Sequence, residues 1–349
     1  MEIITEGKAK LNIKPEKVVS KQMEVFYNPV MKLNRDTSII LLNALNKKDL
    51  RLALPLAGSG IRAIRFLKEL NKGIINELYI NDLSEKSIKL IKNNLKLNKI
   101  KTNDKKTIIS NNDANLFLLN SKGFDYIDID PFGTPNPFLD SAIRRISRTG
   151  ILAVTATDTS CLCGTFPKAG LRKYWATTKK SPIMHETGIR ILIRKIQLVA
   201  AQYDKALTPI LSYSKDHYFR VFFQVEKGKE RVDAILKQHN HLNSTGPMWL
   251  GQLWDTKLVN NMIKSIKTEP SEKNPLVDFL KIIKDESSIN TVGFYDLHFI
   301  CKKYKIKEIP KRQKLIKKIK KLNYKASVTH FNPEAIRSNI PLKKLIKLF

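Results

Sequence analysis

Short apolar runs alternate with amphipathic stretches through the first half of the chain. RLALPLAGSG (51–60) is apolar and ends in a glycine-rich turn, and IRAIRFLKEL (61–70) follows with apolar residues at helical spacing. Compact apolar runs are typical of buried strands, whereas apolar residues that recur once per helical turn indicate a helix. The pattern predicts a strand, a turn and a helix over residues 51–70.

The same alternation continues downstream. Four further apolar segments are interpreted as strands: ELYINDLS (77–84), TIISNNDA (107–114), FDYIDIDPFG (124–133) and GILAVTATD (150–158). Two amphipathic segments are interpreted as helices: EKSIKLIKNNLKLN (85–98) and SAIRRISR (141–148). This β–α order predicts a doubly wound α/β sheet, and ligands of such sheets bind at the carboxyl ends of the strands.

The pattern of strands and helices continues to about residue 225 and then changes. Before the change, TPILSYSKD (208–216) and YFRVFFQVEKG (218–228) predict an antiparallel hairpin at the edge of the sheet. From residue 256 onward, helical segments and basic runs dominate. We therefore expect two domains, residues 1–255 with the doubly wound sheet and residues 256–349 as a smaller, basic α+β domain.

The chain is strongly basic, with 63 Lys and Arg against 32 Asp and Glu and a formal net charge of +31. KRQKLIKKIKK (311–321) has seven basic residues in eleven, and its Leu315, Ile316 and Ile319 fit one face of a helix. A solvated helix face is one interpretation of such a run. Charge of this density equally fits phosphate contact, and we expect a nucleic-acid partner.

The cysteines and histidines form no recognisable metal or nucleophile motif. Cys161, Cys163 and Cys301 are too few for a disulfide framework or a four-ligand zinc site, so we expect no metal. Cys163 is interpreted as structural because methyl transfer to an amine, the chemistry inferred below, needs no covalent enzyme intermediate. His185 and Glu186 are assigned to structure or substrate positioning.

No stretch approaches the ~18 apolar residues of a membrane span, and the N-terminus has no apolar signal core. We expect a cytoplasmic protein without a membrane partner. The sequence leaves the oligomeric state open, and a monomer is the working expectation.

The segment FDYIDIDPFGTPNPF (124–138) carries the most specific chemistry, because its strand ends at Asp130-Pro131-Phe132-Gly133. The Asp carboxylate and a main-chain carbonyl can accept hydrogen bonds from the exocyclic amine of a flat base, and the aromatic ring can stack on it. The alternative is an Asp-Pro that only ends a strand. Together with the upstream pattern, the segment favours an amino-methyltransferase that acts on a nucleobase.

The first three strand ends fit a cofactor with an adenosine moiety. Gly58 and Gly60 allow close backbone approach, and Asp82 lies where an acid meets ribose hydroxyls. Asp113 could accept a hydrogen bond from an adenine amine. The alternatives are a helix cap for Asp82 and a turn residue for Asp113.

Two arginines and one aromatic residue are further candidates. Arg35 and Arg62 can bind a carboxylate with a planar fork, and the methionine end of S-adenosyl-L-methionine presents one. The alternative is a surface ion pair. Phe26 is either a stacking surface or part of the core.

Ten segments, taken together, resemble the tRNA (guanine-N2)-dimethyltransferase family. They run in order along nearly the whole chain: ITEGKAK, VFYNPVMKLNRD, GSGIRAIRF, the strand that ends at Asp82, NNDA, DIDPFGTPNPFLDSA, TATDTSCLCGTFP, HETGIRIL, GPMWLGQLWD and ASVTHFNPEAIR. The resemblance implies a class I (Rossmann-like) methyltransferase domain with a C-terminal domain specific to the family. It also implies transfer of one and then a second methyl group from S-adenosyl-L-methionine to N2 of guanine 26 of tRNA.

The resemblance also assigns site residues. It implies that Asp130 is the catalytic acid/base group, with Phe132 and Phe26 around the target guanine. It implies that Arg35, Arg62, Asp82, Asp113 and Ala114 lie at the cofactor. Gly58 of the first turn is added to them from the residue pattern.

Two departures from the family pattern stand out. Leu54 occupies a position where many relatives have an acid, and KQHNHLNSTGPMW (237–249) lacks the cysteine pairs that many relatives carry there. His239 and His241 are too few to replace four zinc ligands. Two alternative functions stay open on the residues alone: an adenine or cytosine amino-methyltransferase, and a non-catalytic RNA-binding protein that kept the fold.

Overall fold

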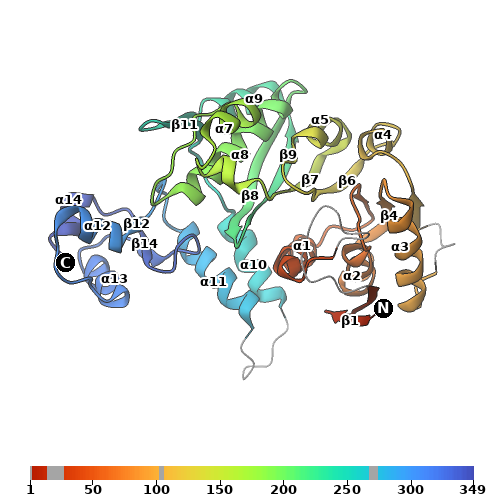
Figure 1. The fold of residues 1–349 in the computed structure, drawn as a ribbon, viewed down its shortest axis with the longest axis horizontal. Helices are drawn as coiled ribbons and strands as arrows, with labels where there is room; N and C mark the ends of the chain where they lie inside the picture. Colours follow the sequence, from red (N-terminus) through yellow and green to blue (C-terminus); the bar gives the residue numbers. More distant parts are fainter. Residues whose placement is uncertain (1, 14–26, 102–105, 267–273) are drawn as a thin grey trace. The chain divides into compact units, whose positions relative to one another are not determined.

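The computed structural model describes residues 2–13, 27–101, 106–266 and 274–349 (Figure 1). The chain separates into two compact units. Unit 1 comprises Met1–Thr157, Gln197–Thr208 and Phe222–Asp233, and unit 2 comprises Asp158–Ile196, Pro209–Val221 and Ala234–Phe349. The domain boundary near residue 255 stays a prediction.

Unit 1 is built on parallel strands. Its strands β3 to β7 belong to a seven-stranded sheet with the order β5-β4-β3-β6-β7-β9-β8, in which the pairs β3–β4, β3–β6, β4–β5 and β6–β7 are parallel. The residues of β8 and β9 are divided between the two units. The strands are β3 (Leu50–Leu54), β4 (Ile75–Asn81), β5 (Thr107–Ser110), β6 (Phe124–Ile129), β7 (Ile146–Ala156), β8 (Lys205–Lys215) and β9 (Tyr218–Lys227). The predicted doubly wound α/β sheet is therefore confirmed. Strands β8 and β9 are joined by a two-residue turn, as expected for the predicted hairpin.

Helices alternate with these strands. They are α1 (Lys32–Leu45), which the 3-10 turn η1 (Pro29–Met31) precedes, α2 (Ile61–Glu69), α3 (Glu85–Leu97), α4 (Ala114–Leu119), α5 (Asn136–Arg145) and α9 (Lys229–Leu236). Helices α2 and α3 confirm the predictions for residues 61–70 and 85–98. The apolar face of α2 is buried, including Ile61, Ile64 and Phe66.

Two predicted boundaries are wrong. The helix predicted over residues 141–148 ends at Arg145, and strand β7 already begins at Ile146, which pairs with Phe124 of β6. Burial of this β-branched residue in the sheet decides its conformation. The strand predicted to reach Asp113 ends at Ser110, because the Asp113 side chain caps α4 instead.

An N-terminal hairpin packs against the helices of unit 1 (Figure 1). Its strands are β1 (Glu2–Glu6) and β2 (Ala9–Ile13). The backbone N–H groups of Lys10 and Asn12 donate to the side-chain amide oxygens of Asn98 and Asn94, each over 2.9 Å. These bonds fix β2 along α3.

Unit 2 begins with helices and ends in a small α/β module. Its first elements are α6 (Thr159–Leu162), α7 (Pro167–Tyr174), α8 (Met184–Ala201), β10 (His239–Leu242), β11 (Thr245–Trp249), α10 (Thr256–Ser265) and α11 (Pro275–Ser287). The module contains β12 (Tyr295–Asp296), α12 (Leu297–Tyr304), α13 (Arg312–Lys321), β13 (Ala326–Val328), β14 (Ala335–Ser338) and α14 (Leu342–Ile346).

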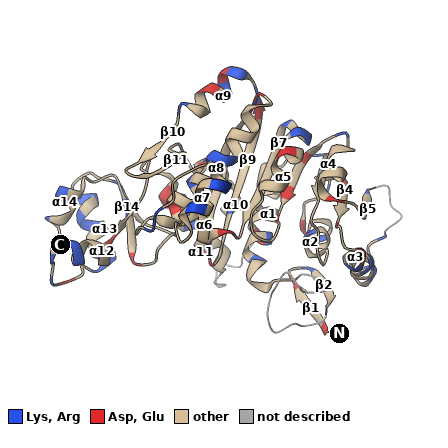
Figure 2. Ribbon diagram, turned by 45° about the horizontal axis from the view of Figure 1, so that its top comes forward, with Lys and Arg blue, Asp and Glu red and all other residues tan. Residues whose placement is uncertain are grey.

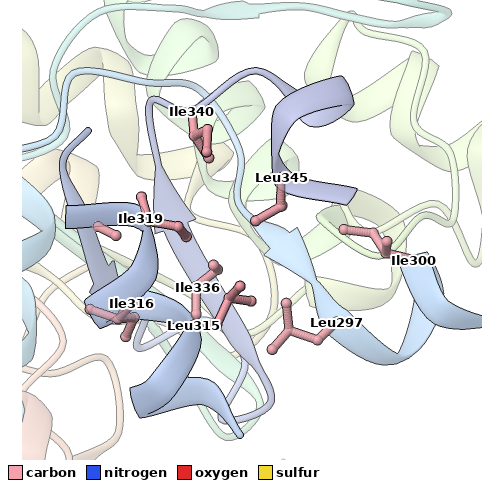
Figure 3. Packing of buried hydrophobic residues seen from close by; sticks show 9 residues of the cluster. Leu297, Ile300, Leu315, Ile316, Ile319, Ile336, Ile340 and Leu345 are labelled. Carbon is pink, nitrogen blue, oxygen red and sulfur yellow. The ribbon is translucent and has the colours of Figure 1, made fainter. Parts of the chain in front are cut away.

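The core of the C-terminal module is apolar (Figure 3). Helix α13 buries Leu315, Ile316 and Ile319, which confirms the predicted apolar face. They pack with Ile336 of β14 and Leu345 of α14 in one cluster of buried residues. The basic residues of α13 are left on its outer side.

Neither a membrane span nor a metal cluster is found in the part of the chain that the structure describes. No helix there is long and apolar enough to cross a bilayer. The same residues contain no group of three or more His, Cys, Asp or Glu side chains that could hold a metal ion.

Candidate active site

A pocket lies at the carboxyl ends of β3 and β6 in unit 1 and encloses about 490 Å³, its open mouth included. Four of the predicted site residues line it: Arg35, Gly58, Arg62 and Asp130. The other lining residues are Tyr27, Asn28, Leu54, Leu56, Ala57, Ser59, Ile61 and Asp128. The position matches the ligand site of doubly wound sheets.

The glycine-rich turn after β3 has the backbone that its sequence predicts. Gly58 and Gly60 have positive φ angles of 54° and 79°, which bulky residues adopt only at a cost. Asp82 accepts a hydrogen bond from the N–H of Gly58 over 2.8 Å and another from Ser84 over 3.0 Å. Ser84 caps α3, so Asp82 holds the turn rather than the helix.

Asp113 and Ala114 lie at the start of α4. One carboxylate oxygen of Asp113 accepts hydrogen bonds from the N–H groups of Asn115 and Leu116, over 2.9 and 3.2 Å. Ala114 is the first residue of the helix and is buried. Asp113 is thus the N-cap of α4 rather than a simple turn residue. Neither Asp113 nor Ala114 lines the pocket.

Arg62 joins the acids at the end of β6. Its guanidinium donates to Asp130 Oδ2 over 2.5 Å and lies 3.3 Å from Asp128 Oδ2. It also donates to Ser38 and Asn34 of α1. Arg62 is buried, whereas the Asp130 side chain keeps 20% of its surface exposed. The carboxylate is therefore held in one orientation and is still accessible to a ligand.

Arg35 is held by an acid of the N-terminal hairpin. It donates to both carboxylate oxygens of Glu6, over 2.7 and 2.5 Å, and to the carbonyl of Asn28. Tyr27 donates to the same carboxylate over 3.0 Å, and burial beside Glu6 raises the pKa of Tyr27 to about 12. The ion pair of Arg35 is buried, unlike the surface pair considered from sequence.

The loop after β6 is clamped to the end of β7. Gly133 N–H donates to Thr157 Oγ1 over 2.6 Å, and Thr157 N–H donates to the Gly133 carbonyl over 2.9 Å. Phe132 is 38% exposed and does not line the pocket. Phe26 lies outside the described residues.

Sequence reasoning missed three residues around the pocket: Asp128, Glu6 and Tyr27. Asp128 has a sequence signal, because side chains two apart on a strand share a face and Asp130 is two residues further on. Tyr27 adjoins the candidate Phe26. Glu6 has no such signal, since its partners Arg35 and Arg65 are distant in sequence.

The candidate nucleophile and acid–base groups of unit 2 contact other protein side chains. Cys163 Sγ lies 3.6 Å from His185 Nδ1, but burial raises the pKa of Cys163 to about 12 and lowers that of His185. A thiol with this pKa is protonated at neutral pH and is a poor nucleophile. Glu186 is fully buried and pairs with Arg190 and Arg337.

The fold and pocket define a Rossmann-like methyltransferase class of protein: a doubly wound sheet with a glycine turn after β3 and acids after β4 and β6. The model of the N2,N2-dimethylguanosine tRNA methyltransferase family matches residues 7–244 and 236–349, and the chain belongs to this family.

Known relatives match over nearly their whole lengths. The tRNA (guanine(26)-N(2)/guanine(27)-N(2))-dimethyltransferase of Aquifex aeolicus is 39% identical, with 99% of this chain and 95% of the relative covered. The tRNA (guanine(26)-N(2))-dimethyltransferase of Methanocaldococcus jannaschii is 38% identical, with 99% and 97% covered. The structure of Trm1 from Pyrococcus horikoshii with S-adenosyl-L-methionine matches with a TM-score of 0.89 and 36% identity, over 100% of this chain and 99% of that one.

Proposed function

We propose that the protein transfers one and then a second methyl group from S-adenosyl-L-methionine to N2 of guanine 26 of tRNA. Membership of the family over the whole chain and the names of its relatives support this activity. The observation that carries it at the level of residues is the Arg62–Asp130 pair in the pocket after β6. It leaves an oriented, accessible carboxylate where a base amine can meet the cofactor.

The glycine turn at the pocket suits close approach of the cofactor. Gly58 presents a bare backbone with positive φ at the pocket wall, and Asp82 fixes this turn through the Gly58 N–H. In this proposal Asp82 faces the ribose hydroxyls, and Asp113 and Ala114 lie beside the adenine. S-adenosyl-L-methionine supplies an electrophilic methyl group when bound.

Arg35 and Arg62 are proposed to bind the carboxylate of the cofactor. Both line the pocket, and both already contact acids, Glu6 and Asp130 respectively. A guanidinium has five N–H donors. Arg35 contacts Glu6 and Asn28 through Nε and Nη2, which leaves Nη1 for a ligand carboxylate. Both Nη groups of Arg62 contact protein side chains, which leaves Nε for the ligand. The acids then fix the direction in which each fork points.

The chemistry at the base rests on Asp130. Its carboxylate accepts a hydrogen bond from the exocyclic N2 of guanine, and takes the proton that the amine loses as the N2–methyl bond forms. Phe132 and Phe26 are proposed to enclose the base. Before the second transfer Asp130 must release this proton to solvent, and a new S-adenosyl-L-methionine must replace the demethylated cofactor. Rotation of the monomethylated amine then presents its remaining proton to the same carboxylate.

The rest of the proposal concerns the molecule and its setting. Residues 1–255 form the methyltransferase domain and residues 256–349 a basic domain that binds tRNA. The protein acts in the cytoplasm as a monomer, without a metal ion.

The test is a methylation assay with labelled S-adenosyl-L-methionine and an unmodified tRNA transcript, followed by digestion to nucleosides. We expect label in N2-methyl- and N2,N2-dimethylguanosine that disappears when guanine 26 is replaced. Label that depends on guanine 27 would add a second target base, which the name of the Aquifex relative also includes. Label in adenosine or cytidine would contradict the proposed base.

Asp130→Ala tests the mechanism. We expect kcat to fall at least about 100-fold, because general-base catalysis and its orientation are removed together. Binding of tRNA should change little, and cofactor binding is measured alongside because Arg62 loses its partner Asp130. Asp140→Ala is a matched control, since its carboxylate lies on α5 with 53% of the side chain exposed. Activity near that of the unchanged protein in Asp130→Ala would refute the mechanism.

A further inference from the structure

Three large apolar side chains are exposed around α7 in unit 2. Phe166, Leu171 and Trp175 lie within ten residues and are 58%, 58% and 51% exposed. None belongs to the pocket described above. Exposed apolar side chains gathered in one segment are typical of a binding surface.

The backbone forces Trp175 outward. Its neighbours Tyr174 and Ala176 are both buried, and Trp175 itself has a φ of 55°, in the left-handed region. Its N–H donates to the carbonyl of Leu171 and ends α7. A bulky residue in this conformation costs about 1–2 kcal/mol, a strain that persists only where the surroundings impose it.

The segment after Trp175 is anchored. Thr177 and Gly246 exchange two backbone hydrogen bonds, of 2.7 and 2.8 Å. Gly164 packs so closely that a Cβ there would lie 2.5 Å from the backbone of Lys179. Trp175 is therefore held in place by the fold, as a preorganised contact residue must be.

The charge around Trp175 is mostly positive, with one acid, Asp158, paired to Lys173 over 2.9 Å. Residues 159–185 contain five basic residues and no acid: Lys168, Arg172, Lys173, Lys179 and Lys180. Arg194 of α8 donates to the Trp175 carbonyl, and the ammonium group of Lys195 lies over the Trp175 ring. Figure 2 shows blue stretches on the ribbons of α7 and α8.

We infer that Trp175 is a stacking platform for a base of the tRNA, and that Arg172 and Lys168 beside it contact phosphates. Aromatic rings interleaved with basic groups bind RNA through stacking and backbone charge. A second copy of this chain fits poorly, because it would bring the same basic surfaces together. The inference rests on the proposed function and adds a tRNA contact within residues 1–255, outside the basic domain 256–349.

The test measures the Kd of an unmodified tRNA transcript for the full chain. We expect Trp175→Ala to raise it about tenfold, within the range that removal of one base stack produces, and Trp175→Phe to stay within about threefold. Ile3→Ala is the control, because Ile3 is 59% exposed on β1. Cofactor binding by each variant checks that the fold is intact.

Tryptophan fluorescence gives a second readout, which uses the unchanged protein and the conservative variant Trp175→Phe. The chain has three tryptophans, and Trp249 and Trp254 are buried, so Trp175 should dominate any change in fluorescence when tRNA binds. We expect tRNA to quench the fluorescence of the unchanged protein and to quench Trp175→Phe much less.

The outcomes separate this inference from the proposed function. Failure of the unchanged protein to methylate guanine 26 would refute the proposed function. Normal methylation, with tRNA affinity of Trp175→Ala equal to that of Ile3→Ala and equal quenching in Trp175→Phe, would overturn the inference alone. A dimer that Trp175→Ala dissociates without change in tRNA affinity would also overturn it and assign the surface to a second copy.

Discussion

Asp128 and Asp130 both bind Arg62, yet their surroundings differ. Asp128 is 2% exposed and accepts a hydrogen bond from the Tyr126 hydroxyl over 2.5 Å, whereas Asp130 lies past the end of β6 and is accessible. We therefore assign Asp128 to positioning the guanidinium and Asp130 to the reaction. Arg62 is the link between them, and its planar fork sets the direction of the Asp130 carboxylate.

Arg62→Lys tests this link. Lysine keeps the charge but has no planar fork, so Asp130 should lose its fixed direction. We expect single-turnover methylation to slow by about 10- to 100-fold, as small misplacements of a reacting group do. Arg51→Lys is the matched control, because Arg51 forms a 2.7 Å pair with Glu77 and does not line the pocket. Equal rates in both variants would contradict the positioning role.

The sequence predicted which residues reach the pocket better than it predicted their partners. Gly58, Arg62 and Asp130 line the pocket because they follow strands β3 and β6, and Arg35 reaches it from α1. The pair Arg62–Asp130 spans 68 positions, and no local pattern encodes such a contact. The roles of these residues stay predictions.

The N-terminal hairpin shows how one short element supports the site. Glu6, the last residue of β1, is buried and pairs with Arg35 of α1 and Arg65 of α2. Arg65 also pairs with Asp36 and Glu69. Two helices that flank the pocket are thus tied to a five-residue strand, and the position of Arg35 depends on that strand.

Glu6→Gln tests this support through pH. Burial raises the pKa of Glu6, but hydrogen bonds and charge from Arg35 and Arg65 outweigh it and hold the pKa below 4.5. Because folding lowers this pKa, ionised Glu6 stabilises the folded protein at pH values above its unfolded-state pKa. That stabilisation is lost as the pH falls through the folded-state pKa. We expect Glu6→Gln to lower the free energy of unfolding by about 3 kcal/mol at neutral pH.

Urea unfolding at several pH values measures the effect. The difference between Glu6→Gln and the unchanged protein should shrink as the pH falls below 4.5. Glu77→Gln is the control, because the Glu77–Arg51 pair is partly exposed and should contribute at most about 1 kcal/mol. A difference for Glu6→Gln that does not change with pH would contradict the ionic role.

Element boundaries were predictable where the local pattern agrees with packing. The period of α13 places three apolar residues inward, and the structure buries all three. The pattern failed at Ile146, which fits the predicted helix but begins strand β7 because it pairs with Phe124 of β6. It failed again at Asp113, where a side-chain cap ends the extended segment early. Both errors come from interactions that hydrophobic periodicity does not encode.

Acids and bases are distributed differently in unit 2. Glu186 and Glu286 are fully buried and both pair with Arg337, at 2.6 and 3.0 Å. The lysines of α13 are exposed instead, and Figure 2 shows blue on the ribbon of this helix. Burial of acids in ion pairs and exposure of lysines leave this surface basic, which is the charge that a polyanion requires.

Salt dependence tests whether this basic surface binds tRNA. Each phosphate that the protein neutralises releases counterions, so tRNA affinity should fall about 1,000-fold or more between roughly 50 and 200 mM salt. We expect only a small change in the affinity for S-adenosyl-L-methionine, measured by titration of the same protein.

The double variant Lys314→Ala/Lys317→Ala removes two exposed charges from α13. It should reduce the slope of log Kd against log salt by about one for each lysine that binds a phosphate. Lys281→Ala is the control, because Lys281 lies on α11 beside Asp278. An unchanged slope in the α13 variant would place the phosphate-binding residues elsewhere on the molecule.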